Sequence, residues 1–147
     1  MPQQGSGDIQ SVDVSLESTL DSVDTAEADT LRVAEEIGFD EDDLHKIGMA
    51  VRECLVNAVV HGNRYSTKKK VHFQVLKGDG RLTITIRDEG EGFELTELPD
   101  PLAEENLLRQ SGRGLLLIQA FMDELEVRRG QPNGTEVRMV KYLAKAS

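Results

Sequence analysis

Two short stretches of alternating apolar and polar residues, 71–75 and 82–86, flank the turn-forming run Gly78-Asp79-Gly80. A period of two places every second side chain on the same face of a strand. Glycine and aspartate supply the backbone conformations that a tight connection between two strands needs. The pattern therefore predicts an antiparallel hairpin with one apolar face, and that face has to be buried against another layer of secondary structure.

Two stretches with helical periodicity precede the hairpin and can supply that layer. The first ends at Gly38, where a left-handed C-terminal cap is expected, and the second begins after Asp40, which can act as its N-cap. The second helix is expected to run until Gly62 and Asn63 end it. The apolar positions of the two stripes are Val23, Ala26, Leu31, Ala34 and Ile37, and then Leu44, Ile47, Val51, Cys54, Leu55 and Ala58.

Other segments extend the sheet and the helical layer. Residues 9–16 alternate as a strand does, a third helix is expected to begin at Gly114, and 125–127 and 136–142 are expected to form a final strand pair. Residues 88–112 have little periodicity, which predicts a long loop that orders around a ligand. Loops of this length in compact domains commonly carry a function.

The whole pattern predicts an α/β two-layer sandwich, with a mostly antiparallel mixed sheet and helices on one face. Residues 1–8 are expected to be a disordered leader, because they are small, polar and without periodicity. Residues 9–147 are expected to form a single domain, since a hydrophobic content of 38% is enough for one core without disulfides.

The charge of the chain argues against several classes of partner. Its formal net charge is −10, from 27 acidic and 17 basic residues, so its summed field repels nucleic acid, and no direct nucleic-acid binding is expected. No stretch approaches the roughly 20 apolar residues of a membrane span, so no membrane partner is expected. Cys54 is the single cysteine and the N-terminus lacks the pattern of a secretory signal, which favours a cytoplasmic location.

Glu53, Asn57 and His61 are spaced four residues apart and therefore share one face of the predicted helix. Each of them alone is most simply interpreted as a solvated residue on the polar side of an amphipathic helix. Asparagine is a poor helix former, however, because its side chain competes for backbone hydrogen bonds. Its position one turn from a glutamate favours a ligand-facing role for this group.

Asp88 directly follows a predicted strand and precedes Gly90 and Gly92. The carboxylate can accept a hydrogen bond from a ligand amine, and the glycines permit a close approach of the backbone. The same run is also typical of an ordinary turn.

A third group, Gly112-Arg113-Gly114, lies where the long loop becomes a helix, and a fourth, Gly134-Thr135, begins the last strand. Backbone N–H groups at the start of a helix, uncovered by glycines, form a site for an anion such as phosphate. A flexible hinge is an equally simple interpretation of the third group, and the fourth alone indicates only a turn.

In this order, Glu-x3-Asn-Ala, Asp-x-Gly-x-Gly-Phe, Gly-x-Gly-Leu and Gly-Thr resemble the four nucleotide-binding boxes of the gyrase, Hsp90, histidine-kinase and MutL (GHKL) superfamily. The resemblance covers residues 9–142 and implies the histidine-kinase-like ATPase fold, also called the Bergerat fold. Within the superfamily the chain is most similar to the anti-sigma-factor serine-protein kinases. The features that carry this likeness are the Asn-Ala-Val-Val-His-Gly run, the Ser-Gly-x-Gly segment and Phe121-Met122-Asp123.

The resemblance implies ATP and Mg²⁺ as cofactors and gives roles to particular residues. Glu53 would be the catalytic general base, Asn57 would be the protein ligand to Mg²⁺, and Asp88 would accept a hydrogen bond from the adenine amino group. The ATP-binding residues that it implies are Asn57, His61, Asp88, Gly90, Gly92, Arg109, Gly112, Arg113, Gly114 and Thr135.

The same resemblance treats the end of the long loop as a lid over the phosphates. Gly112 and Gly114 would let the lid close, and Arg109 and Arg113 would reach phosphate or a partner protein. Thr135 would bind at the adenine side, together with water.

The function that the resemblance implies is that of an ATP-dependent regulatory serine-protein kinase acting as an anti-sigma factor in a partner-switching system. Its partners would be a sigma factor or similar client and an antagonist protein with an acceptor serine. The resemblance also allows a homodimer. Two alternatives stay open: an ATP-binding regulatory module without phosphotransfer, and the catalytic part of a split histidine kinase.

Overall fold

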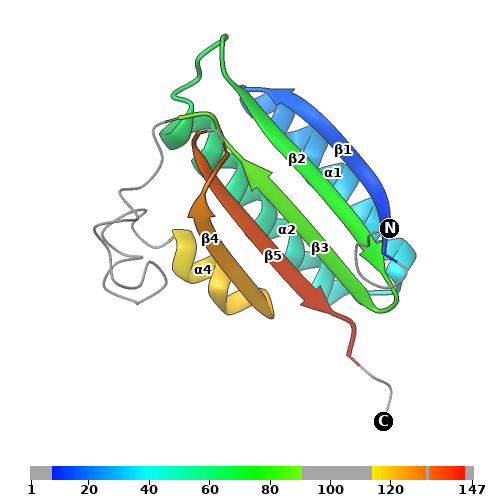
Figure 1. Cartoon of the computed structure of the whole chain (residues 1–147). Coiled ribbons are helices and arrows are strands. Elements are labelled where there is room, and N and C mark those ends of the chain that lie inside the picture. Colours follow the sequence, from blue (N-terminus) through cyan, green and yellow to red (C-terminus); the bar gives the residue numbers. More distant parts are fainter. Residues whose placement is uncertain (1–7, 91–113, 132, 145–147) are drawn as a thin grey trace.

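The computed structural model of the chain describes residues 8–90, 114–131 and 133–144, which form one five-stranded sheet with helices on one face (Figure 1). The strand order is β1-β2-β3-β5-β4. The elements are β1 (Ile9–Glu17), α1 (Leu20–Ile37), α2 (Glu41–Val56), the π-helix η1 (Asn57–Gly62), β2 (Lys70–Gly78), β3 (Arg81–Arg87), α4 (Gly114–Phe121), β4 (Glu124–Arg129) and β5 (Thr135–Tyr142).

The sheet is antiparallel at each of its described pairings, β1 with β2, β2 with β3, β3 with β5, and β5 with β4. The predicted hairpin is confirmed: β2 and β3 pair from His72 opposite Arg87 to Gly78 opposite Arg81. The prediction of a mostly antiparallel sheet is also confirmed. The sequence pattern also predicts a mixed sheet, and this is corrected: the described strands contain no parallel pairing.

The two long helices begin and end where local chemistry predicts. The hydroxyl of Thr19 caps α1 by accepting from the N–H of Ser22, and Gly38 ends α1 with a φ of 112°. Asp40 caps α2, because its carboxylate accepts from the N–H of Asp43 at 2.8 Å. These caps fix the ends of the layer that covers the sheet.

The hydrophobic core lies between this helical layer and the inward face of the sheet. Its largest fully buried side chains are Phe73, Ile47, Leu55, Leu82, Ile84, Ile86, Ile118, Met139, Val23, Val33 and Val51. Cys54 is buried on the same stripe, and loss of hydration raises the pKa of its thiol, so it is a packing residue. None of the described helices combines the length and apolar character needed to cross a membrane.

One residue that the alternating pattern predicts to face the core is exposed. Val14 alternates with Val12 and Leu16 in the sequence, yet its side chain is 44% exposed while the other two are partly buried. Strand β1 is at the edge of the sheet and has an irregularity between Gln10 and Val12. An edge strand has no neighbour on its open side, so alternation there buries less surface than in a central strand.

Candidate functional site

The side chains of Glu53 and Asn57 meet the first residue of α4. A methyl carbon placed on Gly114 would lie 2.4 Å from Oε2 of Glu53 and 3.2 Å from Nδ2 of Asn57. Only glycine allows this approach without displacing the carboxylate. Among the described residues, no hydrogen bond or ion pair occupies the Glu53 carboxylate. A carboxylate and a carboxamide are therefore held beside the N-terminus of α4, and the dipole of a helix favours an anion at that end.

The helix that carries these residues continues to Gly62, as predicted, but its last part is a π-helix and not the expected α-helix. Residues Asn57–Gly62 form η1, and the N–H of Asn63 donates to the carbonyl of Ala58 at 2.8 Å, a span of five residues. Turns of this kind are rare and are frequent at functional sites. Apolar periodicity could not predict the change, because one extra residue in a turn barely alters the pattern.

His61 lies on η1 and is exposed. Its ring has no hydrogen bond or ion pair in the described part of the chain. A nucleotide-binding role for His61 therefore stays a prediction that rests on the sequence alone.

Asp88 lies at the end of β3 and is only 6% exposed. Its Oδ1 accepts from the N–H of Gly90 at 2.9 Å and from the N–H of Thr135 at 3.2 Å, while its own N–H donates to the carbonyl of Thr135 at 3.1 Å. Burial raises the pKa of Asp88, and these two hydrogen bonds and the charges of Arg87 and Lys69 oppose that rise. No described donor reaches its other oxygen, Oδ2.

Glycines surround this carboxylate at contact distance. A methyl carbon on Gly62 would lie 2.3 Å from Oδ2 of Asp88, and one on Gly90 would lie 2.0 Å from the carbonyl oxygen of Gly62. Gly134 has a φ of 83°, and a methyl carbon there would lie 1.8 Å from the carbonyl oxygen of Asp88. The end of η1, the loop after β3 and the start of β5 therefore meet around Asp88 with no side chain between them.

Asn63 and Glu89 form a partly buried network beside this cluster. The sequence patterns predicted Asn63 only as the end of the second helix and gave Glu89 no role. Asn63 is 1% exposed; its Oδ1 accepts from the N–H of Glu89 at 2.7 Å, and its Nδ2 donates to Ser18 Oγ and to the carbonyl of Lys70, both at 2.9 Å. The N–H of Lys70 donates to Glu89, which lowers the pKa of that carboxyl, and His72 contacts the second Glu89 oxygen at 2.6 Å. The sequence signal that could have indicated them is their position, since Asn63 directly follows Gly62 and Glu89 directly follows Asp88.

Four of the predicted nucleotide-binding residues, Gly92, Arg109, Gly112 and Arg113, lie outside the described residues. Their roles stay predictions. Of the others, the structure brings Glu53, Asn57 and Gly114 together in one cluster and Asp88, Gly90 and Thr135 in a second. The chain segment from Glu53 to Gly62 connects the two clusters.

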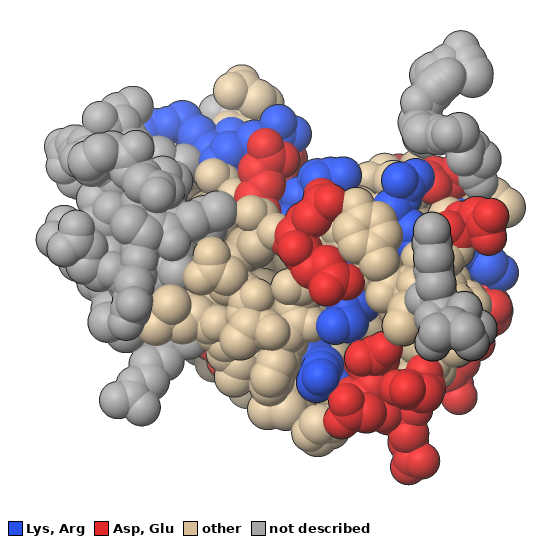
Figure 2. Space-filling view, turned by 90° about the horizontal axis from the view of Figure 1, so that it is seen from below, with Lys and Arg blue, Asp and Glu red and all other residues tan. Residues whose placement is uncertain are grey.

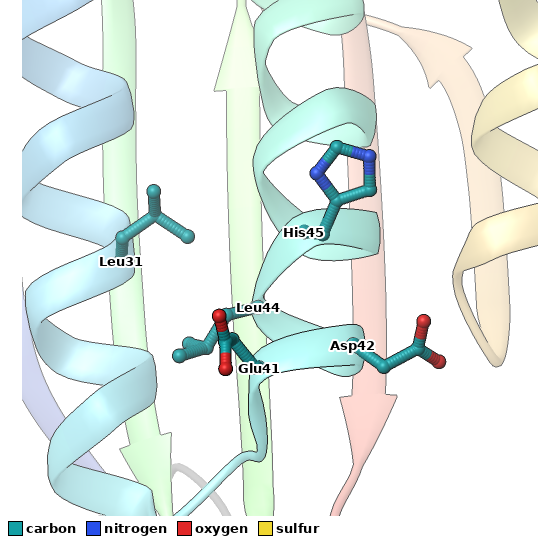
Figure 3. A pocket seen from close by; sticks show the side chains of 5 residues that line it. All are labelled: Leu31, Glu41, Asp42, Leu44 and His45. Atoms are coloured by element: carbon teal, nitrogen blue, oxygen red, sulfur yellow. The ribbon is translucent and has the colours of Figure 1, made fainter.

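A separate hollow of about 540 Å³ lies between α1 and the start of α2, and Figure 3 shows Leu31 reaching toward α2 there. The residues that line it are Leu31, Glu41, Asp42, Leu44 and His45. Glu41, which lines it, is 12 residues before Glu53, or about 18 Å along the helix at about 1.5 Å per residue. Its carboxylates would repel phosphate, so this hollow is not the nucleotide site.

Residues 16–141 match the family model of the histidine kinase-like ATPase domain. The anti-sigma F factor of Oceanobacillus iheyensis is 36% identical to this chain over 107 residues, which cover 71% of this chain and 73% of that protein. The anti-sigma F factor of Bacillus thuringiensis is 34% identical over 108 residues, covering 72% and 74%.

Two solved structures share the fold. The crystal structure of the RsbU and RsbW domains of Rv1364c from Mycobacterium tuberculosis matches 97% of this chain at 22% identity with a TM-score of 0.64. This chain spans about a third of that longer chain, 33%. The mycobacterial sensor histidine kinase MprB matches 89% of this chain and 96% of its own at 19% identity, with a TM-score of 0.53. The chain therefore belongs to the histidine kinase-like ATPase domain family, among the relatives of the anti-sigma F factors.

Proposed function

We propose that this protein is an ATP-dependent serine-protein kinase that acts as an anti-sigma factor by switching between protein partners. The observation that carries the proposal is the carboxylate of Glu53, which has no partner among the described residues and is held beside Asn57 and the first residue of α4. A cytoplasmic location and a homodimer, both expected from the sequence, belong to the proposal.

The cluster around Asp88 fits an adenine base. It offers a buried carboxylate oxygen without a described donor and a buried Thr135 hydroxyl, also without a described partner. Such groups are costly to bury alone and are satisfied when a ligand supplies the missing hydrogen bond. The adenine amino group is a donor, whereas guanine presents an acceptor at that position, so Asp88 would select ATP over GTP. Gly90, and by resemblance Gly92, leave room for the base.

The cluster around Glu53 fits the phosphates. The oxygen of the Asn57 carboxamide is a hard ligand suited to Mg²⁺, which keeps several waters and binds phosphate oxygens as well. In the described ranges, no group of three or more His, Cys, Asp or Glu side chains could hold a metal ion. The proposed Mg²⁺ would therefore depend on water and phosphate oxygens for most of its ligands. When bound, Mg²⁺ would neutralise charge on the transferring phosphate. The N–H groups at the start of α4 would bind phosphate oxygens, and Gly112, Arg109 and Arg113 would complete the lid.

Glu53 would act as the general base. In phosphotransfer to a serine, the hydroxyl oxygen bonds to the γ-phosphorus, the bond from that phosphorus to the bridging oxygen breaks, and ADP leaves with the electron pair. The serine proton passes to the Glu53 carboxylate. Positioned bases contribute about 10² to 10⁴ in rate, so Glu53 should affect transfer far more than binding.

The partner proteins are proposed from the relatives. Two of the similar proteins are named anti-sigma F factors, which motivates a sigma factor as the client, and a structural neighbour contains an RsbW domain. The phosphorylated protein would be an antagonist that competes with the client and carries an acceptor serine.

The test uses the full chain with radiolabelled Mg-ATP and the candidate antagonist protein. Glu53→Gln keeps the shape of the side chain but removes its basicity, so transfer should fall at least 100-fold while the ATP Kd stays within threefold. Glu35→Gln, an exposed glutamate on α1, is the matched control and should behave as wild type. Label on the antagonist that survives acid indicates phosphoserine.

Three results would contradict the proposal. Acid-labile label would favour the split histidine kinase. ATP binding with no transfer to any antagonist would favour a regulatory module. Equal transfer by wild type and Glu53→Gln would remove Glu53 from the mechanism.

A further inference from the structure

The loop between η1 and β2, residues 63–69, carries three basic side chains that form no ion pair with a described acidic group. The side chains of Arg64, Lys68 and Lys69 have no ion pair or hydrogen bond in the described structure. Outside this loop, Arg129 is the one other described lysine or arginine whose side chain has no ion pair or hydrogen bond. Basic side chains that do form ion pairs are Arg32, Lys46, Arg52, Lys70, Lys77, Arg81, Arg128, Arg138 and Lys141.

The backbone of this cationic loop is held in an unusual shape. Arg64 has a φ of 52° and Tyr65 a φ of 59°, so two adjacent residues with full side chains adopt the left-handed conformation. This is unfavourable for both, and it persists only where the surroundings enforce it. Here the N–H of Tyr65 donates to the carbonyl of Val59 at 2.9 Å, and that of Ser66 donates to the carbonyl of Asn63 at 3.0 Å.

Further hydrogen bonds fix the second half of the loop. The N–H of Lys69 donates to the carbonyl of Ser66 at 3.3 Å, and the N–H of Lys68 donates to the Ser66 hydroxyl at 3.2 Å. Tyr65 as a residue is 51% exposed. The loop therefore presents an aromatic ring among unpaired cations on a backbone that is already ordered, which lowers the entropy cost of binding a partner.

We propose that the cationic loop is a docking site for an acidic segment of a partner protein. Its cations supply charge complementarity, and the Tyr65 ring supplies apolar contact area and a hydroxyl for hydrogen bonding. The side chains of Arg64, Tyr65 and Lys68 take part in none of the contacts described for Glu53, Asn57 or Asp88, whereas the charge of Lys69 also acts on Asp88.

A protein segment fits this loop better than a nucleic acid or an anionic membrane does. Those ligands extend over a wide surface, and the net charge of this chain is −10. Figure 2, from the end opposite η1, shows Asp and Glu side chains grouped on the molecule. An extended polyanion that reaches beyond the loop would be repelled by the net negative charge of the chain, whereas a short acidic segment meets only the local cations.

The test is binding of a fluorescein-labelled 12-residue peptide of alternating Glu and Ser, followed by anisotropy at low and moderate salt. The double variant R64E/K68E should bind it at least tenfold more weakly than wild type, and Tyr65→Ala at least threefold more weakly. Lys69 is left unchanged because its charge acts on Asp88. The double variant R32E/K46E, with the same change in net charge on the helical layer, should stay within twofold of wild type.

The proposal is overturned if wild type does not bind the peptide, or if both double variants lose affinity equally. It is also overturned if a single-stranded oligonucleotide or anionic vesicles bind the loop more tightly than the peptide does. The Kd for ATP and the thermal midpoint of R64E/K68E should match those of wild type. A failure of docking is thereby distinguished from a failure of the proposed kinase function and from misfolding.

Discussion

Asp88 is a buried carboxylate whose two oxygens have different surroundings. Oδ1 accepts two backbone N–H groups, and Oδ2 has no donor in the described chain. The bonded oxygen fixes the side chain, so the free oxygen has a defined direction before any ligand arrives. Preorganisation of this kind favours binding, because the acceptor needs no rearrangement.

Asp88→Asn should weaken ATP binding at least tenfold while leaving the protein folded. The amide oxygen can still accept from Gly90 and Thr135, whereas the amide nitrogen would present a donor to the adenine amino group. A hydrogen bond to a charged acceptor is worth about 1.5–3 kcal/mol, which corresponds to this loss. Isothermal titration calorimetry measures it, and Asp79→Asn in the exposed hairpin turn is the control. Equal affinity in the Asp88 variant would reject the adenine assignment.

As pH is lowered, ATP affinity should begin to fall at a higher pH than it would if Asp88 had the ordinary pKa of an aspartate. The folded pKa of Asp88 is raised above its unfolded value of about 3.9, so Asp88 becomes protonated at a higher pH and loses its role as an acceptor. The stability of the fold should depend on pH in the opposite direction to ATP affinity. The contribution of Asp88 to stability is complete below its unfolded pKa and is lost as pH rises through its folded pKa.

Calorimetry and urea unfolding at stepped pH would measure both trends, with Asp88→Asn as the reference for stability. An ATP affinity that stays constant down to the ordinary aspartate range would contradict the expectation.

At the scale of elements, the close approach of the Glu53 side chain to the first residue of α4 depends on one glycine. Gly114→Ala would place a methyl carbon against the Glu53 carboxylate and push that side chain away. We expect phosphotransfer to fall at least 30-fold, with a stability change within about 1 kcal/mol, because the displaced group is the end of a flexible side chain.

Gly48→Ala is the matched control within α2. Its methyl carbon would lie 3.3 Å from a Glu27 oxygen and 3.6 Å from Leu31, which can adjust. Alanine should stabilise this helix by up to about 1 kcal/mol and leave transfer unchanged. Transfer assays and thermal unfolding distinguish the two variants, and equal activity in both would remove the requirement for glycine at residue 114.

The sequence predicted the elements well, because caps and periodicity are local. Gly38, Asp40 and Gly80 act where they were expected. The Asn63 network was not predicted, since it depends on contacts between residues up to 45 positions apart, such as Asn63 with Ser18. The π-helix was not predicted because one extra residue in a turn barely alters the apolar pattern. Motif order gave the residues of the two clusters, but not their partners or the free oxygen of Asp88.

For the whole molecule, one core supports every element that carries the site. Phe73 lies in the central part of β2 and is 1% exposed. Phe73→Ala should lower the free energy of unfolding by about 3–5 kcal/mol through lost burial and a cavity. Urea unfolding measures the loss, and Gln74→Ala on the other face of the strand should cost less than about 1 kcal/mol. Similar losses at both positions would contradict a core on the helical side alone.

The π-helical turn of η1 also restricts which insertions and deletions the chain can tolerate. A deletion of one residue within Asn57–Gly62 that the turn did not absorb would rotate all later residues by about 100° around the helix axis. Asn63 would leave its three partners, and Gly62 would leave Asp88. Insertions and deletions should therefore be absent from this segment in functional homologues, while single substitutions on its exposed side are tolerated.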